Sequence, residues 1–173
     1  MSHVLLIGFM GSGKSTVGRV LANRLGRPFV DLDDRVCALS GTSVERIFAE
    51  YGEARFRSLE ADALESLRHE PSSVVACGGG VVVSEASRTL LLQLGTVVYL
   101  RVGAAEALDR IGDTSSRPLL AGPEAESAAK ALLAERESVY ASVAQVSVDT
   151  RGCSVEQVTG KIITALEEVD ATC

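Results

Sequence analysis

Short apolar runs alternate along the chain with segments whose apolar residues recur every three or four positions. The continuous runs predict buried strands, because a strand that is covered on both faces has no polar side. These runs are residues 4–7, 28–31, 72–77, 96–102 and 144–149. The periodic segments predict helices at about 14–25, 56–67, 104–111, 124–140 and 155–166. Strands that alternate with helices predict a parallel sheet covered on both sides.

Local signals mark where two of the helices begin or end. Gly26 follows the last apolar position of the first helix, where glycine commonly terminates a helix. The segment TSVE has the form of a capping box, in which Thr42 and Glu45 would satisfy each other's backbone groups at a helix start. The chain has 173 residues, with no internal repeat and no linker, so we expect one domain over residues 1–173.

Composition and charge exclude several broad classes of protein. Hydrophobic residues make up 46% of the chain and charged residues 23%, as in an ordinary globular protein. The net charge of -6 argues against a general nucleic-acid binder, which usually has a basic excess. The four scattered cysteines fit reduced thiols better than a zinc site or a disulfide framework. Without a membrane-length apolar run or a signal segment, a cytoplasmic protein is expected.

The segment GFMGSGKS, residues 8–15, matches the phosphate-binding pattern G-x-x-x-x-G-K-[ST]. Its glycines let successive backbone N–H groups turn toward phosphate oxygens. Lys14 would place a cation at the outer phosphates, and Ser15 would offer a hydroxyl group to Mg²⁺. The helix that follows adds its positive dipole end. The alternative, a glycine-rich turn with an incidental lysine, is weaker, so a nucleoside triphosphate site is predicted.

Three aspartates crowd into the segment FVDLDD at residues 29–34. They fit either a solvated helix start or a site that needs a cation or a hydroxyl group close by.

Three consecutive glycines, Gly78, Gly79 and Gly80, follow the third predicted strand. Ligands of α/β proteins bind at this end of the strands, where glycine lets the backbone approach closely. A tight turn is the alternative, but it would ordinarily need only one glycine.

Four arginines stand out against the acidic background, namely Arg57, Arg110, Arg117 and Arg136. Any single arginine is more often a solvated surface charge. Arginine is nevertheless suited to hold a carboxylate or phosphate through two parallel hydrogen bonds. Glu60 lies one helical turn after Arg57 and can orient it. Arg110 and Arg117 bracket the polar stretch IGDTSS, which is typical of a mobile lid that carries a phosphate-neutralising arginine.

Together these motifs resemble the shikimate kinase family, and the resemblance covers nearly the whole chain. It rests on GFMGSGKST at 8–16, DLD at 31–33, GEARFRSLE at 52–60, CGGGVV at 77–82 and RPLL at 117–120. The resemblance implies an α/β P-loop NTPase fold of the nucleoside-monophosphate-kinase type, with a five-stranded parallel sheet flanked by helices. It also implies a substrate-binding segment at 31–60 and a lid at 112–123. The implied activity is ATP-dependent phosphorylation of the 3-hydroxyl group of shikimate, in the biosynthesis of chorismate and aromatic amino acids.

The resemblance further implies roles for individual residues. The hydroxyl groups of shikimate would be held by Asp33, the candidate base, and by the backbone of Gly78, Gly79 and Gly80. Its carboxylate would be held by Arg57 and Arg136. ATP would be held by Gly11, Ser12, Gly13, Lys14, Ser15, Thr16, Arg110 and Arg117. Mg²⁺ would be bound by Ser15, with Asp31 in support. The catalytic set would be Asp33, Lys14 and Arg117.

Two alternatives to this function are open at the level of the sequence. Another small-molecule kinase of the same fold, such as a gluconate kinase, would keep the phosphate loop but need not keep DLD, FRSLE and the three glycines together. A non-catalytic nucleotide-binding regulatory module would be expected to lose Lys14, Asp33 or an arginine, and this sequence retains them. We expect a monomer, with no nucleic-acid partner and no membrane association. Asp34 fits a helix-start carboxylate.

Overall fold

A computed structural model describes residues 2–112 and 124–172 of the chain. Arg117 and nearly all of the expected lid, residues 112–123, lie outside the described residues. Five parallel strands form one sheet in the order β2-β3-β1-β4-β5, which confirms the predicted fold class. The strands are β1 (His3–Ile7), β2 (Phe29–Asp31), β3 (Val74–Ala76), β4 (Gly95–Arg101) and β5 (Val146–Asp149).

Helices connect and cover the strands, as expected for a parallel sheet. Their bounds are α1 (Lys14–Leu25), α2 (Leu32–Ser40), α3 (Val44–Ser66), α4 (Glu85–Leu94), α5 (Ala104–Ile111), α6 (Ala125–Val143) and α7 (Val155–Thr172), and a 3₁₀ turn, η1 (Leu67–His69), follows α3. Within the described ranges, no helix is long and apolar enough to cross a membrane.

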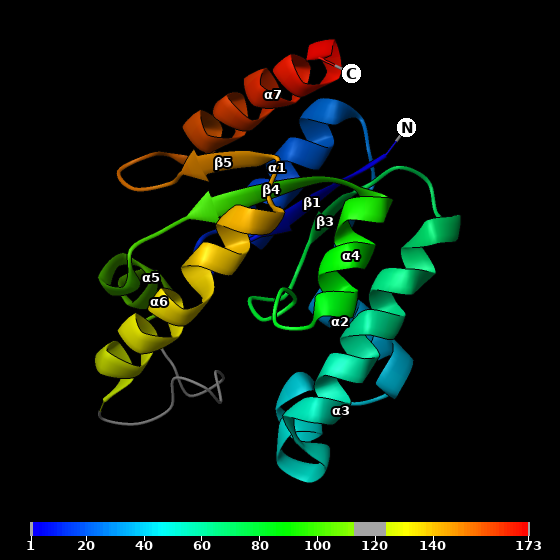
Figure 1. Cartoon of the computed structure of the whole chain (residues 1–173), viewed down its shortest axis with the longest axis vertical. Coiled ribbons are helices and arrows are strands. Elements are labelled where there is room, and N and C mark those ends of the chain that lie inside the picture. The colour runs from blue at the N-terminus through cyan, green and yellow to red at the C-terminus, as the bar shows by residue number, and fades with distance from the viewer. Residues whose placement is uncertain (1, 113–123, 173) are drawn as a thin grey trace.

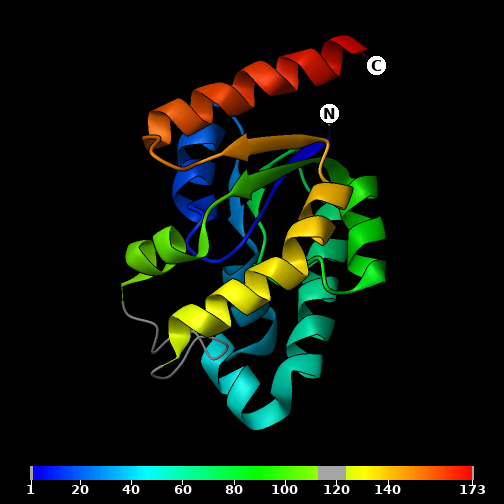
Figure 2. The same ribbon diagram turned by 60° about the vertical axis from the view of Figure 1, so that its left-hand side comes forward.

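The central strand β1 divides the core into two layers. Val4 and Leu6 face α1 and α7, whereas Leu5 and Ile7 face the side covered by α3, α4 and α6. All four side chains are buried. Figures 1 and 2 show α1 and α7 over one face of the sheet and α4 and α6 over the other, while α3 extends well beyond it. The alternation follows from the two-residue period of a strand, which places successive side chains on opposite faces.

The structure corrects the predicted helix start near residue 42. Ser43, and not Thr42, is the N-cap of α3, and its hydroxyl oxygen accepts from the backbone N–H of Arg46 at 3.3 Å. Thr42 belongs to the preceding turn, where its backbone N–H donates to Oγ of Ser40 at 3.3 Å. Gly52, with φ 78°, interrupts α3, so this helix is two helical segments joined at a kink.

Two helices, α2 and α4, were not predicted by the spacing of apolar residues. α2 begins directly at the end of β2, within the aspartate cluster, and its first turn contains Asp33 and Asp34. The expectation that Asp34 lies at a helix start is therefore confirmed. α4 begins after Ser84, whose hydroxyl accepts from the N–H of Ser87, and it buries three leucines, Leu90, Leu91 and Leu94. Its apolar face is short, which weakens the periodic signal.

Candidate active site

The phosphate loop joins the central strand β1 to α1, as the sequence predicts. Gly8, Gly11 and Gly13 have φ angles of 145°, 77° and 92°, in the region that favours glycine. The loop also passes close to neighbouring backbone, since a Cβ at Gly11 would lie 2.5 Å from the carbonyl oxygen of Ala107. Lys14 lies across the loop, and its Nζ donates to the carbonyl oxygens of Gly8 at 2.9 Å and Phe9 at 3.0 Å. The ammonium group is thus held at the loop mouth.

The carboxylate of Asp31 links the phosphate loop to α2. Its Oδ2 accepts from the hydroxyl group of Ser15 at 2.7 Å, and its Oδ1 accepts from the backbone N–H of Asp33 at 3.1 Å. Asp31 is therefore the N-cap of α2 as well as the partner of Ser15. The cap fixes the first turn of α2, and with it the position of Asp33 beside the loop.

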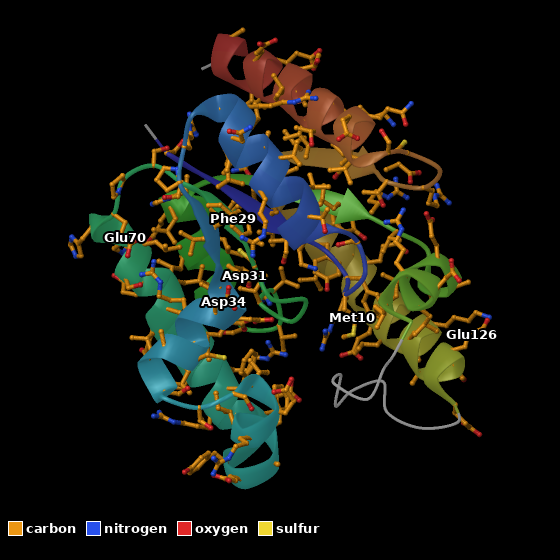
Figure 3. The ribbon with its side chains drawn as sticks, turned by 180° about the vertical axis from the view of Figure 1, so that it is seen from behind. Met10, Phe29, Asp31, Asp34, Glu70 and Glu126 are labelled. Atoms are coloured by element: carbon orange, nitrogen blue, oxygen red, sulfur yellow. The ribbon has the colours of Figure 1, made fainter. Side chains whose placement is uncertain are left out.

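A cavity of about 390 Å³ lies between the phosphate loop, the end of β2 and the three-glycine segment. Figure 3 shows Asp31 where β2 passes into α2, and Met10 of the phosphate loop across from it. The lining of this cavity contains most of the residues predicted to bind the nucleotide and several predicted to bind the substrate. These are Gly11, Gly13, Lys14, Ser15, Thr16, Asp31, Asp33, Gly78, Gly79 and Arg110, with Met10, Ala76, Cys77 and Ile111. Ser12 is buried within the loop itself.

Arg57 projects from α3 against the three-glycine segment. A Cβ at Gly80 would overlap its guanidinium group, so glycine is required there for this close approach. Nη1 of Arg57 donates to Oε2 of Glu60 at 2.8 Å, and Nη2 donates to Oε1 of Glu53 at 3.1 Å. The Arg57 side chain is 16% exposed, which leaves part of the guanidinium group accessible to a ligand.

Glu60 is a buried member of the site, with only 1% of the residue exposed. A Cβ at Gly78 would lie 2.5 Å from Oε1 of Glu60 and 3.3 Å from Oδ1 of Asp33, so both carboxylates border this glycine. Burial raises the pKa of the Glu60 carboxyl, Asp33 raises it further, and Arg57 and Arg136 oppose the shift. Substitution at Gly78 would therefore disturb two acidic groups at once.

Arg136 approaches the same glycines from α6. Its Nη1 donates to the carbonyl oxygen of Gly79 at 3.4 Å. Tyr140, one turn further along α6, donates its hydroxyl hydrogen to the same oxygen. The Tyr140 ring is stacked on Tyr99 of β4, with ring centroids 5.0 Å apart. Burial raises the pKa of Tyr140 to about 12. These contacts join α6, the sheet and the three-glycine segment.

Arg110 lies at the nucleotide end of the cavity. Its Nη2 donates to the carbonyl oxygen of Thr150 at 3.0 Å, and its Nη1 donates to Oγ1 of Thr150 at 3.2 Å and to the carbonyl oxygen of Gly11 at 3.4 Å. Arg110 thus bridges α5, the phosphate loop and the loop after β5. This position is compatible with a contact to the adenine base, which stays a prediction.

The sequence matches the family model described as shikimate kinase over residues 10–167. The chain belongs to the shikimate kinase family. It is 44% identical over 165 residues to the shikimate kinase of Geobacter metallireducens, and the match covers 95% of this chain and 92% of that protein. The solved structure of shikimate kinase from Acinetobacter baumannii in complex with shikimate is 34% identical, has a TM-score of 0.93, and is matched over 97% of this chain and 94% of that one.

Membership of the shikimate kinase family confirms the resemblance and the expected kinase activity with ATP. A gluconokinase from Sinorhizobium meliloti is also similar, with a TM-score of 0.62 over 97% of this chain and 93% of that one. Its sequence identity is 17%, which indicates a shared fold alone. The gluconate kinase alternative therefore has support from the fold but not from the sequence.

Two residues that border the cavity's glycine segment were not among those predicted to bind ligands. Glu60 was expected only to orient Arg57, and its burial depends on Gly78 and on helices that are distant in sequence. Tyr140 had no predicted role. The sequence could have indicated Tyr140 through its spacing of four residues from Arg136, which places both side chains on one face of a helix.

Proposed function

We propose that this chain transfers the γ-phosphoryl group of ATP to the 3-hydroxyl group of shikimate, with shikimate bound between α2, α3, α6 and the three-glycine segment. The observation that supports this most directly is the convergence of Asp33, Glu60 and Arg57 on Gly78 and Gly80, beside the phosphate loop. Two arginines suit a monocarboxylate, and an aspartate beside backbone polar groups suits a polyol.

The substrate-binding part of the proposal assigns the shikimate carboxylate to Arg57 and Arg136. The two guanidinium groups approach adjacent glycines of one segment, Arg57 at Gly80 and Arg136 at the carbonyl oxygen of Gly79. The ring hydroxyl groups would then face the backbone of Gly78 and the carboxylate of Asp33. Asp33 would orient the 3-hydroxyl group and accept its proton as the oxygen attacks the γ-phosphorus atom.

The nucleotide part of the proposal assigns the phosphates to the loop 8–15 and to Lys14. Phosphoryl transfer depends mainly on alignment and on neutralisation of charge on the transferring group. Lys14, already at the mouth of the loop, supplies a positive charge to the outer phosphates. Arg110 would contact adenine, and Arg117, outside the described residues, would add a second charge from the lid over residues 112–123.

Mg²⁺ is the ion that this proposal implies. The hydroxyl of Ser15 and the carboxylate of Asp31 offer hard oxygen ligands, which fit Mg²⁺ bound mainly through water and phosphate oxygens. Within the described residues, no group of three or more acidic, histidine or cysteine side chains could hold a metal by itself. Bound Mg²⁺ would neutralise phosphate charge, while Ser15 and Asp31 keep the ligand oxygens in position.

We further propose that the chain acts as a monomer in the cytoplasm. An ATP-dependent reaction and reduced thiols both fit a cytoplasmic protein.

A coupled assay of ADP release with shikimate, gluconate and nucleoside monophosphates tests the proposed function. With ATP present, turnover is expected with shikimate and not with gluconate or a nucleoside monophosphate. Turnover with gluconate or a nucleoside monophosphate instead would overturn the assignment of the substrate. Absence of turnover with all three substrates, from a folded protein that binds ATP, would favour a non-catalytic nucleotide-binding module.

A further inference from the structure

Glu60 has one satisfied and one unsatisfied carboxylate oxygen. Oε2 accepts from Arg57, but Oε1 is buried and has no hydrogen-bond partner among residues 2–112 and 124–172. A buried acceptor without a donor is costly, and a buried charge more so. Oε1 lies beside Gly78, on the side that Asp33 also borders. A proton on Oε1 would turn this acceptor into a donor that borders the same glycine as the carboxylate of Asp33.

The charged groups around Glu60 lie on its own helix and on two others. Arg57 lies on the same helix, Asp33 on α2 and Arg136 on α6. The thiol of Cys77 at the end of β3 also faces Glu60, and burial raises its pKa, so it contributes no charge near neutral pH. Lys14 and Asp31, one of each sign, face that thiol from the nucleotide side.

The buried and half-buried charges around the three-glycine segment are balanced before shikimate binds, while Glu53, the other partner of Arg57, is 45% exposed and screened by solvent. Arg57 and Arg136 carry two positive charges, and Asp33 and Glu60 carry two negative ones when both are ionised. The carboxylate of shikimate adds a third negative charge to a site in which Glu60 and Arg136 are buried. Uncompensated buried charge is strongly unfavourable, and buried groups change protonation state to avoid it. Of the two acids, Asp33 is needed as an anion to accept the proton of the 3-hydroxyl group, which leaves Glu60 to take up a proton.

We propose that shikimate binds to this chain together with one proton, which is taken up from solvent by Oε1 of Glu60. The neutral carboxyl group then donates a hydrogen bond to the carboxylate of Asp33. Loss of the negative charge on Glu60 also weakens its ion pair with Arg57, so that the Arg57 guanidinium group can bind the carboxylate of shikimate. No covalent bond other than the O–H bond is formed. This inference rests on the proposed assignment of the shikimate carboxylate to Arg57 and Arg136.

The proposal has a defined pH dependence. Burial already raises the pKa of Glu60 in the free protein, and a substrate carboxylate beside Arg57 raises this pKa further. Between the pKa of Glu60 in the free protein and its pKa in the complex, binding consumes a proton. Shikimate binding therefore weakens as the pH rises through this interval, by at most about tenfold per pH unit.

Isothermal titration calorimetry of shikimate, at one pH in buffers with different ionisation enthalpies, counts the protons taken up. The wild-type protein is expected to take up a fraction of a proton that increases toward one as the pH falls from alkaline to neutral. Glu60→Gln is expected to bind shikimate without proton uptake. Glu53→Gln is the matched control, because Glu53 also pairs with Arg57 but its side chain is 45% exposed, and proton uptake is expected to persist.

The calorimetry separates failure of this inference from failure of the proposed function. Shikimate binding without proton uptake in the wild-type protein, or unchanged uptake in Glu60→Gln, overturns the inference and leaves the proposed function intact. Absence of shikimate binding overturns both.

Infrared difference spectroscopy of the wild-type protein provides a second test that does not depend on a variant folding. Addition of shikimate is expected to produce the C=O stretching band of a protonated carboxylic acid. The band is expected to shift when the protein contains ¹³C-labelled glutamate, which assigns the proton to a glutamate. A missing band, or a band that the label does not shift, overturns the assignment to Glu60.

Discussion

The hydroxyl group of Ser15 donates a 2.7 Å hydrogen bond to Oδ2 of Asp31, although the two residues come from different strand–helix connections. The same carboxylate caps α2 through the N–H of Asp33. One side chain therefore holds a proposed Mg²⁺ ligand and also sets the start of the helix that carries the candidate base. The nucleotide and substrate halves of the site share this carboxylate.

Replacement of Asp31 by asparagine tests its proposed support of Mg²⁺. Asparagine can still cap α2, but it lacks the negative charge beside Ser15. We expect the Mg²⁺ concentration for half-maximal activity to rise by about 10- to 100-fold, as for other groups that orient metal ligands. Activity measured against free Mg²⁺ checks this. Asp34→Asn, an exposed neighbour, is the control, and an equal shift in both variants would contradict the prediction.

Replacement of Asp33 by asparagine tests its role as the base. We expect kcat to fall by about 100-fold or more, because asparagine can orient the hydroxyl group but cannot accept its proton. The Kd for ATP is expected to stay unchanged, since the proposal assigns Asp33 to the substrate and not to the nucleotide. A kcat within a few-fold of the wild-type value would mean that Asp33 is not the base. Loss of the native fold, detected by circular dichroism, would make it structural.

Arg136 provides a test of the carboxylate assignment. Arg136→Met keeps much of the length of this buried side chain but removes its charge. Loss of a charged hydrogen bond is expected to cost about 2 kcal/mol, which is about 30-fold in shikimate affinity. The Kd for ATP is expected to remain the same. Arg55→Met, an exposed arginine on α3, is the control, and normal shikimate binding by Arg136→Met would refute the assignment.

Gly80 is predicted to act through the position of Arg57. Gly80 lacks a positive φ angle, so alanine fits its backbone, but the new methyl group would displace the Arg57 guanidinium group. We expect KM for shikimate to rise by about 10- to 100-fold, because a small misplacement of a binding group weakens positioning strongly. The steady-state kinetics of Gly80→Ala measure this effect.

A second glycine gives the matched control for that substitution. Gly160 lies within α7, and a Cβ there would meet no atom within 4 Å. Gly160→Ala is expected to leave KM unchanged and to raise the free energy of unfolding by about 0.5–1 kcal/mol, because alanine favours the helix. If Gly80→Ala also left KM unchanged, the close contact with Arg57 would have no part in substrate binding.

The raised pKa of the Tyr140 phenol predicts that the protein loses stability at alkaline pH. Its pKa is raised by burial to about 12 in the folded protein, above the value of about 10 for an exposed tyrosine. The stability that depends on the neutral phenol is therefore complete below about pH 10 and is lost as the pH rises toward 12. Thermal unfolding from pH 9 to about 12 should show a steeper fall in Tm for the wild type than for Tyr140→Phe.

Tyr51→Phe controls for the general effect of alkaline pH, because Tyr51 is 63% exposed. Its Tm should follow that of the wild type across this range. An equal fall in Tm for Tyr140→Phe and the wild type would show that ionisation of the buried phenol does not drive alkaline unfolding.

The parts of this protein that are encoded locally were predictable from the sequence. The phosphate loop depends on three spaced glycines, Lys14 and Ser15, and its geometry is contained within residues 8–15. Strands β1, β3 and β4 were predictable because a buried strand needs a continuous apolar run, whereas β2 is half-buried and β5 exposes Ser147, so their signals are weaker. The start of α3 was misplaced by one residue, since Thr42 and Ser43 are both acceptable caps and only the preceding turn distinguishes them.

The tertiary structure alone decided the strand order and the substrate side of the site. The resemblance to a family named Arg57 and Arg136, but their approach to one glycine segment depends on the packing of α3 and α6 around the sheet. The burial of Glu60 and the bond from Tyr140 to Gly79 likewise join groups that are distant in sequence. Periodicity records which face of an element is apolar, but not which element covers it, because that choice depends on the packing of the whole core.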